Sequence, residues 1–213
     1  LIHAHHCNTN QLEQYNSDND SGFFLRVNWS SNGEDKTFWK NKFAAVIRKY
    51  AMQVDFFNEA EKTNIAILVS KSSHCLYDIL AHHQSGRLNA KVAFVASNHN
   101  DLKNITEQFG CVFYHCPILN KDKASQEAKL TSLMQQHDVK SIVLARYMQI
   151  LSSGFIEAYN KKIINIHHSF FLFFFGTKPY HQAWDKGVKV IGATSHFVTS
   201  ELDQGPIITQ SVA

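Results

Sequence analysis

The sequence lacks a long apolar run, a signal peptide and a concentrated charge, and each absence removes a class of protein. The longest apolar stretch, residues 170–175, is far shorter than the roughly 20 residues that a membrane-spanning helix needs. His3, His5 and His6 interrupt the apolar residues near the start, so we expect no signal peptide. The formal net charge is only +3 and the basic residues are scattered, which argues against a nucleic-acid-binding surface.

The sequence also lacks the spacings that bind metals. Its four cysteines show no Cys-x-x-Cys or Cys-x-x-His pattern, and we expect them to be reduced thiols in a cytoplasmic protein. Adjacent histidines, such as residues 82–83 and 167–168, face opposite ways on a strand, and no His-Glu-x-x-His motif is present. We therefore predict no metal site. A covalent mechanism at Cys75 is the weaker alternative, although the start of a helix lowers a thiol pKa.

What is present is the composition of an ordinary globular protein, with 44% hydrophobic and 18% charged residues among 213. Residues 2–9 and 23–29 read as strands, and Thr37 can cap a helix that ends near Tyr50. The expected inward residues of that helix are Phe38, Phe43, Val46, Ile47 and Tyr50. A further short strand is expected at residues 54–57. The first 60 residues thus predict a small α+β module.

From Ile65 onwards, short apolar runs alternate with helical patterns, which favours an α/β domain with a mainly parallel sheet. The expected strands are residues 65–69, 92–96, 112–115, 141–145 and 163–166. The expected helices are residues 75–85, 101–109, 125–137 and 154–160. Functional groups in such sheets gather where the strands end, which directs attention to residues 71–75, 146–151 and 165–169.

A group of polar residues at those ends has the chemistry for attack on a small carbonyl carbon. Asn165 and His167 are two apart at a strand end, so their side chains share one face and can polarise one oxygen, each donor contributing roughly 3 kcal/mol. Asp203 precedes a Gly205-Pro206 turn and can accept a proton from water or an amine. Taken singly, each of these residues can equally be a capping, core or turn residue.

Three segments carry a family resemblance: residues 165–169 (Asn-Ile-His-His-Ser), 191–198 (Ile-Gly-Ala-Thr-Ser-His-Phe-Val) and 202–208 (Leu-Asp-Gln-Gly-Pro-Ile-Ile). They resemble the formyltransferase-fold enzymes that use 10-formyltetrahydrofolate. The resemblance implies that Asn165, His167, Asp203 and His196 are catalytic. It also implies a small ACT-like α+β sandwich followed by a Rossmann-like formyltransferase-fold domain.

Within that family, the doubled histidine at 167–168 and residues 144–152 and 178–183 are most similar to the formyltetrahydrofolate deformylases. The resemblance then implies two domains. Residues 1–60 would form an ACT-like regulatory domain without its first strand and helix. Residues 64–213 would form the catalytic domain without its C-terminal end.

The same resemblance implies a folate-binding segment. The residues that would bind substrate are Arg146, Met148, Gln149, Ile150 and Leu151. Arg146 can meet a substrate carboxylate or form a plain surface ion pair, and periodicity alone would place Met148 and Leu151 in a helix core. No cofactor is implied, because 10-formyltetrahydrofolate is the substrate.

The loop at residues 70–76 contains no glycine, whereas glycinamide ribonucleotide transformylases hold a phosphorylated substrate on a glycine-rich loop here. We therefore expect water as the nucleophile and hydrolysis to formate and tetrahydrofolate, supplying purine synthesis and balancing one-carbon pools. One alternative is formyl transfer to an amine. The other is a non-catalytic regulator that binds folate or an amino acid, which is expected if the phenylalanines at 170–175 disrupt the site. These phenylalanines replace a Leu-Pro turn of the family. The expected partners are a glycine or methionine effector and further copies of the chain, with no nucleic acid or membrane.

Overall fold

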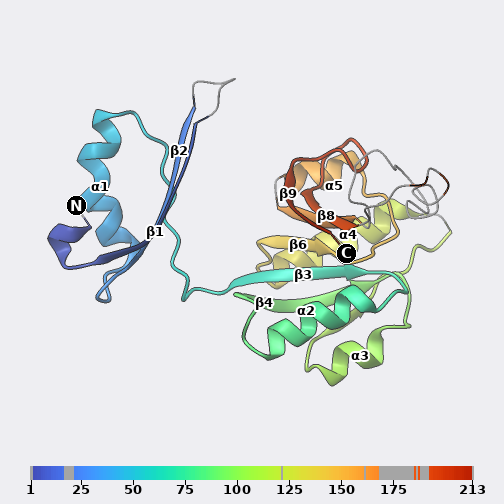
Figure 1. Ribbon diagram of the computed structural model, residues 1–213. Helices are drawn as coiled ribbons and strands as arrows, with labels where there is room; N and C mark the ends of the chain where they lie inside the picture. Colours follow the sequence, from blue (N-terminus) through green and yellow to red (C-terminus); the bar gives the residue numbers. More distant parts are fainter. Residues whose placement is uncertain are drawn as a thin grey trace. The chain divides into compact units, whose positions relative to one another are not determined.

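The computed structural model describes residues 2–16, 22–120, 122–160, 162–167, 185, 187 and 192–212. Its contacts divide the chain into two compact units, Leu1–Glu61 and Lys62–Ala213, which we describe separately (Figure 1). Three segments named above lie outside the described residues: His168, residues 170–175 and residues 178–183. Among the described residues, no helix is both long and apolar enough to span a membrane.

The first unit contains a two-stranded antiparallel sheet and one long helix. Strand β1 (Asn8–Asn16) pairs with β2 (Phe23–Ser30), and helix α1 covers Lys36–Lys49. The strand expected at residues 2–9 begins only at Asn8, because His3–His5 form a 3-10 turn, η1. The predicted cap at Thr37 is also wrong: the carboxylate of Asp35 accepts the hydrogen bond from the backbone N–H of Phe38 at 2.7 Å.

Aromatic rings hold this unit together. Trp39 is only 3% exposed and packs edge-on against Trp29, with ring centroids 5.3 Å apart. Tyr50, expected to point inward, is 64% exposed because it follows the last turn of α1. The strand expected at residues 54–57 is wrong as well, since that segment has no regular secondary structure. Phe56 instead packs against Trp29.

The second unit is built on a seven-stranded sheet in the order β5-β4-β3-β6-β7-β8-β9. Its strands are β3 (Thr63–Val69), β4 (Ala90–Ser97), β5 (Phe113–His115), β6 (Ser141–Leu144), β7 (Ile163–His167), β8 (Gly192–Phe197) and β9 (Ile207–Val212). The first five strands in chain order are parallel, and β8 and β9 are antiparallel to their neighbours. The predicted α/β class with a mainly parallel sheet is confirmed.

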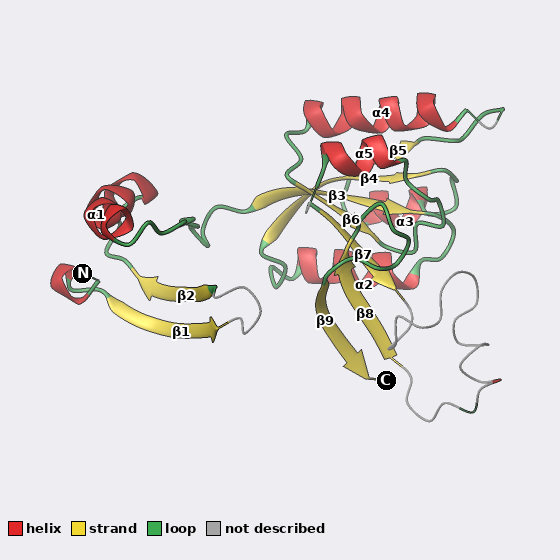
Figure 2. Cartoon of the chain, turned by 90° about the horizontal axis from the view of Figure 1, so that it is seen from above, coloured by secondary structure: helices red, strands yellow, loops and turns green. Residues whose placement is uncertain are grey.

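Helices cover both faces of this sheet, as Figure 2 shows. Helices α4 (Lys123–Gln136) and α5 (Ser153–Ala158) lie on one face, and α2 (His74–Gln84) and α3 (Lys103–Gln108) on the other. Because both faces are covered, residues 66–69 of the inner strand β3 are fully buried. Burial of each such Leu or Ile side chain contributes about 1.5–3 kcal/mol.

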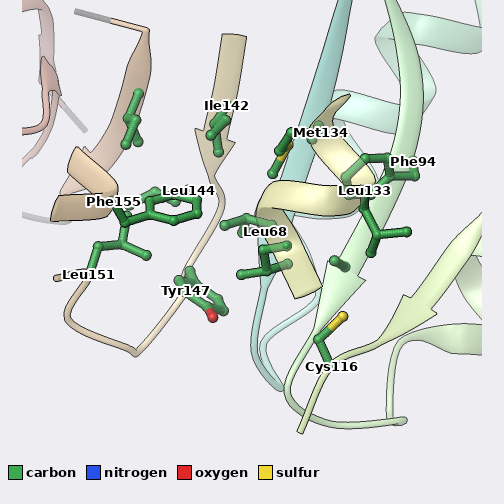
Figure 3. Close-up of a cluster of buried hydrophobic side chains, with 14 of the residues drawn as sticks. Leu68, Phe94, Cys116, Leu133, Met134, Ile142, Leu144, Tyr147, Leu151 and Phe155 are labelled. Carbon is green, nitrogen blue, oxygen red and sulfur yellow. The ribbon is translucent and has the colours of Figure 1, made fainter. Parts of the chain in front are cut away.

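The larger core cluster lies under α4 and α5 (Figure 3). Leu68, Phe94 and Ile142 come from the sheet, Met134 from α4 and Phe155 from α5. The neighbouring strands β3, β6 and β7 are parallel, so the segments that follow them emerge at one edge of the sheet. This carboxyl edge carries most of the polar residues singled out above.

Candidate active site

Strand β7 carries Asn165 and His167 at the carboxyl edge, two residues apart and therefore on one face. Its antiparallel partner β8 places His196 directly opposite Asn165. Directly opposed residues on a sheet project to the same side, so the imidazole of His196 joins the other two groups. His167 is 6% exposed and His196 only 1%, so both rings are withdrawn from bulk water.

Asp203 reaches these residues because the loop between β8 and β9 closes tightly. The backbone N–H of Phe197 donates to the carbonyl of Pro206 at 2.9 Å. Gly205 lies so close to β8 that a Cβ atom there would stand 1.6 Å from the carbonyl oxygen of Phe197. Asp203 itself adopts a left-handed backbone with φ of 55°, a conformation that aspartate tolerates better than most residues.

The four polar side chains form one cluster, which we call the quartet: Asn165, His167, His196 and Asp203. The carboxylate of Asp203, 12% exposed, lies 3.5 Å from Nδ1 of His167 and 3.8 Å from Nε2 of His196. The amide nitrogen of Asn165 donates to the same carboxylate at 3.4 Å. These distances are long for hydrogen bonds.

The tautomer of His196 follows from its backbone neighbour. Its Nδ1 lies 2.9 Å from the carbonyl oxygen of Phe197, which can only accept, so Nδ1 carries a proton. In the neutral ring Nε2 is then an acceptor, and it lies 3.3 Å from the amide nitrogen of Asn165. Asn165 therefore directs its amide nitrogen at both His196 and Asp203. To donate to a substrate oxygen, it must exchange one of these two long hydrogen bonds.

The segment expected to bind folate is a loop between β6 and α5 rather than a stretch of helix. It starts beside the quartet, because Leu144 at the end of β6 pairs with Asn165. Met148 and Ile150 are 56% and 67% exposed, Gln149 is half-buried, and Leu151 is buried at 7%. The side chain of Leu151 thus belongs to the core cluster, whereas the apolar side chains of Met148 and Ile150 are exposed.

Arg146 opens this loop with a left-handed backbone, φ 60°, and its Nε atom is buried. Its positive charge acts on the nearby Cys75 at the start of α2. Burial nevertheless raises the pKa of the Cys75 thiol above its ordinary value, the charge of Arg146 opposing that rise and the charge of Asp78 adding to it. The thiol therefore stays protonated at neutral pH, which makes a covalent cysteine mechanism unfavourable.

Two buried polar residues near the site, Ser70 and Glu127, were not singled out from the sequence. Ser70 was passed over as part of a loop notable only for its lack of glycine. Glu127 could have been found, because it lies three and seven residues before Leu130 and Met134 on the buried stripe of α4. Among the described residues, no group of three potential ligands could hold a metal ion.

The fold is that of the formyl transferases, whose family model matches residues 63–213. The chain is 43% identical to the formyltetrahydrofolate deformylase of Bacillus subtilis, with 100% of this chain and 72% of that protein covered. A crystal structure of a formyltetrahydrofolate deformylase from Pseudomonas syringae pv. tomato superposes with a TM-score of 0.92 at 37% identity, covering 100% of this chain and 72% of that one. The chain therefore belongs to the formyltetrahydrofolate deformylase family.

A second group of related structures comprises transformylases. Glycinamide ribonucleotide transformylase 1 from Geobacillus kaustophilus superposes with a TM-score of 0.68 at 26% identity, over 72% of this chain and 83% of that one. The likeness to the deformylase from Pseudomonas is thus greater in structure, identity and coverage of this chain.

Proposed function

We propose that the chain hydrolyses 10-formyltetrahydrofolate to formate and tetrahydrofolate. The observation that carries the proposal is the carboxylate of Asp203, 12% exposed, which lies between two imidazoles and an amide at the carboxyl edge of the sheet. Membership of the deformylase family supplies the substrate, since that is what its relatives are named for. Formate released in this way would serve purine synthesis and balance one-carbon pools.

The reaction needs one proton acceptor and one oxyanion site. Asp203 takes a proton from water while the water oxygen forms a bond to the formyl carbon. His167 and Asn165 donate to the resulting tetrahedral oxyanion, Asn165 by giving up one of its two long contacts. The carbon–nitrogen bond then breaks, the proton passes to N10 of the folate, and formate and tetrahydrofolate leave. His196 supports the site by holding the amide of Asn165.

Water is favoured over an amine acceptor by the loop at residues 70–73. It has no glycine, and the hydroxyl of its first residue, Ser70, already accepts a hydrogen bond from Met148 N and donates one to Asn98. A loop engaged in this way offers little to a phosphorylated amine. Formyl transfer to an amine is the second candidate, supported by the likeness to transformylase structures.

Substrate would bind along the loop that begins with Arg146. Met148 and Ile150 offer exposed apolar surface for the flat pterin ring, and Gln149 and backbone groups offer hydrogen bonds to its edge. Arg146 would meet a carboxylate, and Leu151 would act through its backbone, since its side chain lies in the core.

One assay separates the candidates. The protein is incubated with 10-formyltetrahydrofolate alone, and formate and tetrahydrofolate are followed. Release of both without an amine is the expected result. Release of tetrahydrofolate without formate, and only after addition of glycinamide ribonucleotide, would favour the transferase, because the formyl group then passes to the amine. Folate binding without release of either product would favour a non-catalytic regulator.

We further propose a regulatory role for the first unit, a homo-oligomeric state and a cellular location. We expect residues 1–60 to act as an ACT-like regulatory domain that binds a small amino acid such as glycine or methionine. Tyr15, Phe23 and Phe24 expose large apolar surfaces on its two-stranded sheet, which supports association of chains into a homo-oligomer. Calorimetry with glycine and methionine tests the binding of an amino acid, and sedimentation of the protein tests the homo-oligomer.

We also expect a cytoplasmic location, because free thiols such as Cys111 and Cys116 are buried in the core.

A further inference from the structure

Three buried polar side chains outside the quartet connect the core to the loop at residues 146–151. They are Ser70 at the end of β3 and the neighbours Gln126 and Glu127 on α4, with exposures of 3%, 4% and 8%. A buried polar group is costly unless it is hydrogen-bonded, and a buried carboxylate especially so. Their partners therefore indicate what the three residues do.

Glu127 holds the far end of the loop. One carboxylate oxygen accepts the backbone N–H of Ser152 at 2.8 Å, and the other accepts the hydroxyl of Ser152. That hydroxyl in turn accepts the N–H of Phe155 at 3.2 Å and caps helix α5. Lys123, one turn earlier on α4, places its ammonium 3.6 Å from the carboxylate. Glu127 thus fixes the residue at which the loop becomes a helix.

Ser70 and Gln126 hold the near end. The hydroxyl of Ser70 accepts the backbone N–H of Met148 at 3.0 Å. Gln126 donates to the carbonyl of Cys116 at 2.6 Å and also hydrogen-bonds the phenol of Tyr147. The loop is therefore held on both sides of Met148 and Ile150, although neither of those side chains is itself buried.

These hydrogen bonds fix the loop with two apolar side chains, Met148 and Ile150, in exposed positions. Tyr147 and Leu151 point into the core cluster (Figure 3), at 8% and 7% exposure. Between them Met148 and Ile150 face outward. Two exposed apolar side chains on a loop would normally lose area by folding back onto the protein, and the hydrogen bonds to Ser70 and Glu127 oppose that collapse.

We propose that Glu127 and Ser70 are positioning residues for folate: they hold the backbone of residues 146–151 so that Met148 and Ile150 meet the pterin. The inference rests on the proposed function and on the binding role of this loop. Both side chains are buried and neither belongs to the quartet, so we expect them to act on affinity and leave the chemical step unchanged.

The test compares Glu127→Ala, Glu127→Gln and Ser70→Ala with the unchanged chain. Glu127→Ala should raise both KM for 10-formyltetrahydrofolate and Kd for tetrahydrofolate about tenfold, because displaced contacts lose affinity, with kcat changed less than about threefold. Glu127→Gln should restore most of the affinity, since a carboxamide can still accept from Ser152 N and donate to its hydroxyl. Ser70→Ala should weaken binding in the same direction.

Lys123→Ala is the matched control, because it removes the ion pair on α4 but keeps both hydrogen bonds to Ser152. This variant should leave KM and Kd unchanged.

Calorimetry with tetrahydrofolate needs no turnover, so it separates this inference from the proposed function. If the unchanged chain releases no formate, yet Glu127→Ala weakens tetrahydrofolate binding, the hydrolase proposal fails and this inference stands. If Glu127→Ala and Ser70→Ala are folded, by thermal unfolding, and bind with unchanged Kd, the inference is overturned. Should Glu127→Ala fail to fold, Ser70→Ala decides, and an unchanged Kd in that variant overturns the inference.

Discussion

At the scale of single residues, the hydrogen bonds around Asp203 indicate which neighbouring groups are donors and which are acceptors. The proton on Nδ1 of His196 is committed to a backbone carbonyl, so this ring presents only an acceptor to the site. His167 approaches the carboxylate through Nδ1 at 3.5 Å. The carboxylate therefore accepts from the amide of Asn165 and lies beside Nδ1 of His167, and it is the group best placed to accept a proton from water.

Replacing Asp203 by Asn keeps the shape of the side chain and removes its ability to accept that proton. We expect formate release to fall by about 100-fold or more, with tetrahydrofolate binding largely kept. Steady-state kinetics and calorimetry measure the two effects. Asp101→Asn, at an exposed aspartate of the same unit, is the control. A near-normal rate in Asp203→Asn would remove the carboxylate from the mechanism.

Two glycines of the second unit offer a matched pair. A Cβ at position 205 would stand 1.6 Å from the carbonyl oxygen of Phe197, so Gly205→Ala must push the Asp203 loop away from β8. We expect a loss of about 2 kcal/mol or more in the free energy of unfolding, together with a fall in kcat. Gly154→Ala has nothing within 4 Å and lies in α5, so it should be neutral or stabilising by up to about 1 kcal/mol. Denaturant unfolding of both variants measures the difference, and equal stabilities would contradict the tight fit.

At the scale of elements, helix α4 and the loop that follows β6 behave as one packed piece. Burial raises the pKa of Tyr147 to about 12, with the hydrogen bond to Gln126 partly opposing the rise. The unfolded chain loses this proton near its ordinary pKa of 10, while the folded chain keeps it. The folded state therefore binds more protons between about pH 10 and 12, so stability falls as pH rises through that window.

The expected size of this alkaline loss is up to about 3 kcal/mol, since each unit of pKa difference corresponds to about 1.4 kcal/mol. Tyr147→Phe should remove it and flatten the dependence of the free energy of unfolding on pH above about 10. Denaturant titrations at a series of alkaline pH values check this. An equally steep decline in Tyr147→Phe would assign the loss to other groups.

The elements also show what could be predicted from the sequence and why. Buried parallel strands such as β3 read as continuous apolar runs, so the order of elements after residue 64 was predicted correctly. The strand expected at residues 54–57 failed because a strand needs a hydrogen-bonded neighbour, which local alternation does not supply. The cap of α1 was misplaced by two residues because Asp35 and Thr37 are both good caps, and only the folded geometry shows which one accepts from Phe38.

The residues of the site could likewise be predicted only where local sequence determines their position. Period two was enough to bring Asn165 and His167 to one face, and strand pairing adds His196. Neither argument could place Asp203, because its position depends on a loop folded against β8 at Gly205. The supporting contact of Glu127 was missed for a similar reason: its partner Ser152 lies 25 residues further along the chain.

At the scale of the whole molecule, the two units have separate cores. Trp29 and Trp39 lie in the first unit, whereas helices α2, α3, α4 and α5 lie in the second. The third tryptophan, Trp184, belongs to the second unit, so tryptophan fluorescence reports on the first unit alone only in a Trp184→Phe variant. Far-UV circular dichroism reports mainly on the second unit.

We expect denaturant unfolding to give different midpoints by these two probes, since two cores need not unfold together. In the Trp184→Phe background, Gly205→Ala should lower the midpoint by circular dichroism and leave the midpoint by fluorescence in place. Coincident midpoints that move together in Gly205→Ala would mean that the units unfold as one cooperative body.

The backbone conformation of Arg146 is energetically unfavourable, unlike that of the residues on either side of it. A left-handed backbone costs a non-glycine residue on the order of 1 kcal/mol or more, and glycine would adopt φ of 60° freely. A change of Arg146 to glycine would therefore relax the backbone while removing the positive charge at the start of the loop that we propose binds folate. The position is one where a search for thermostable variants and a search for tight folate binders would select opposite residues.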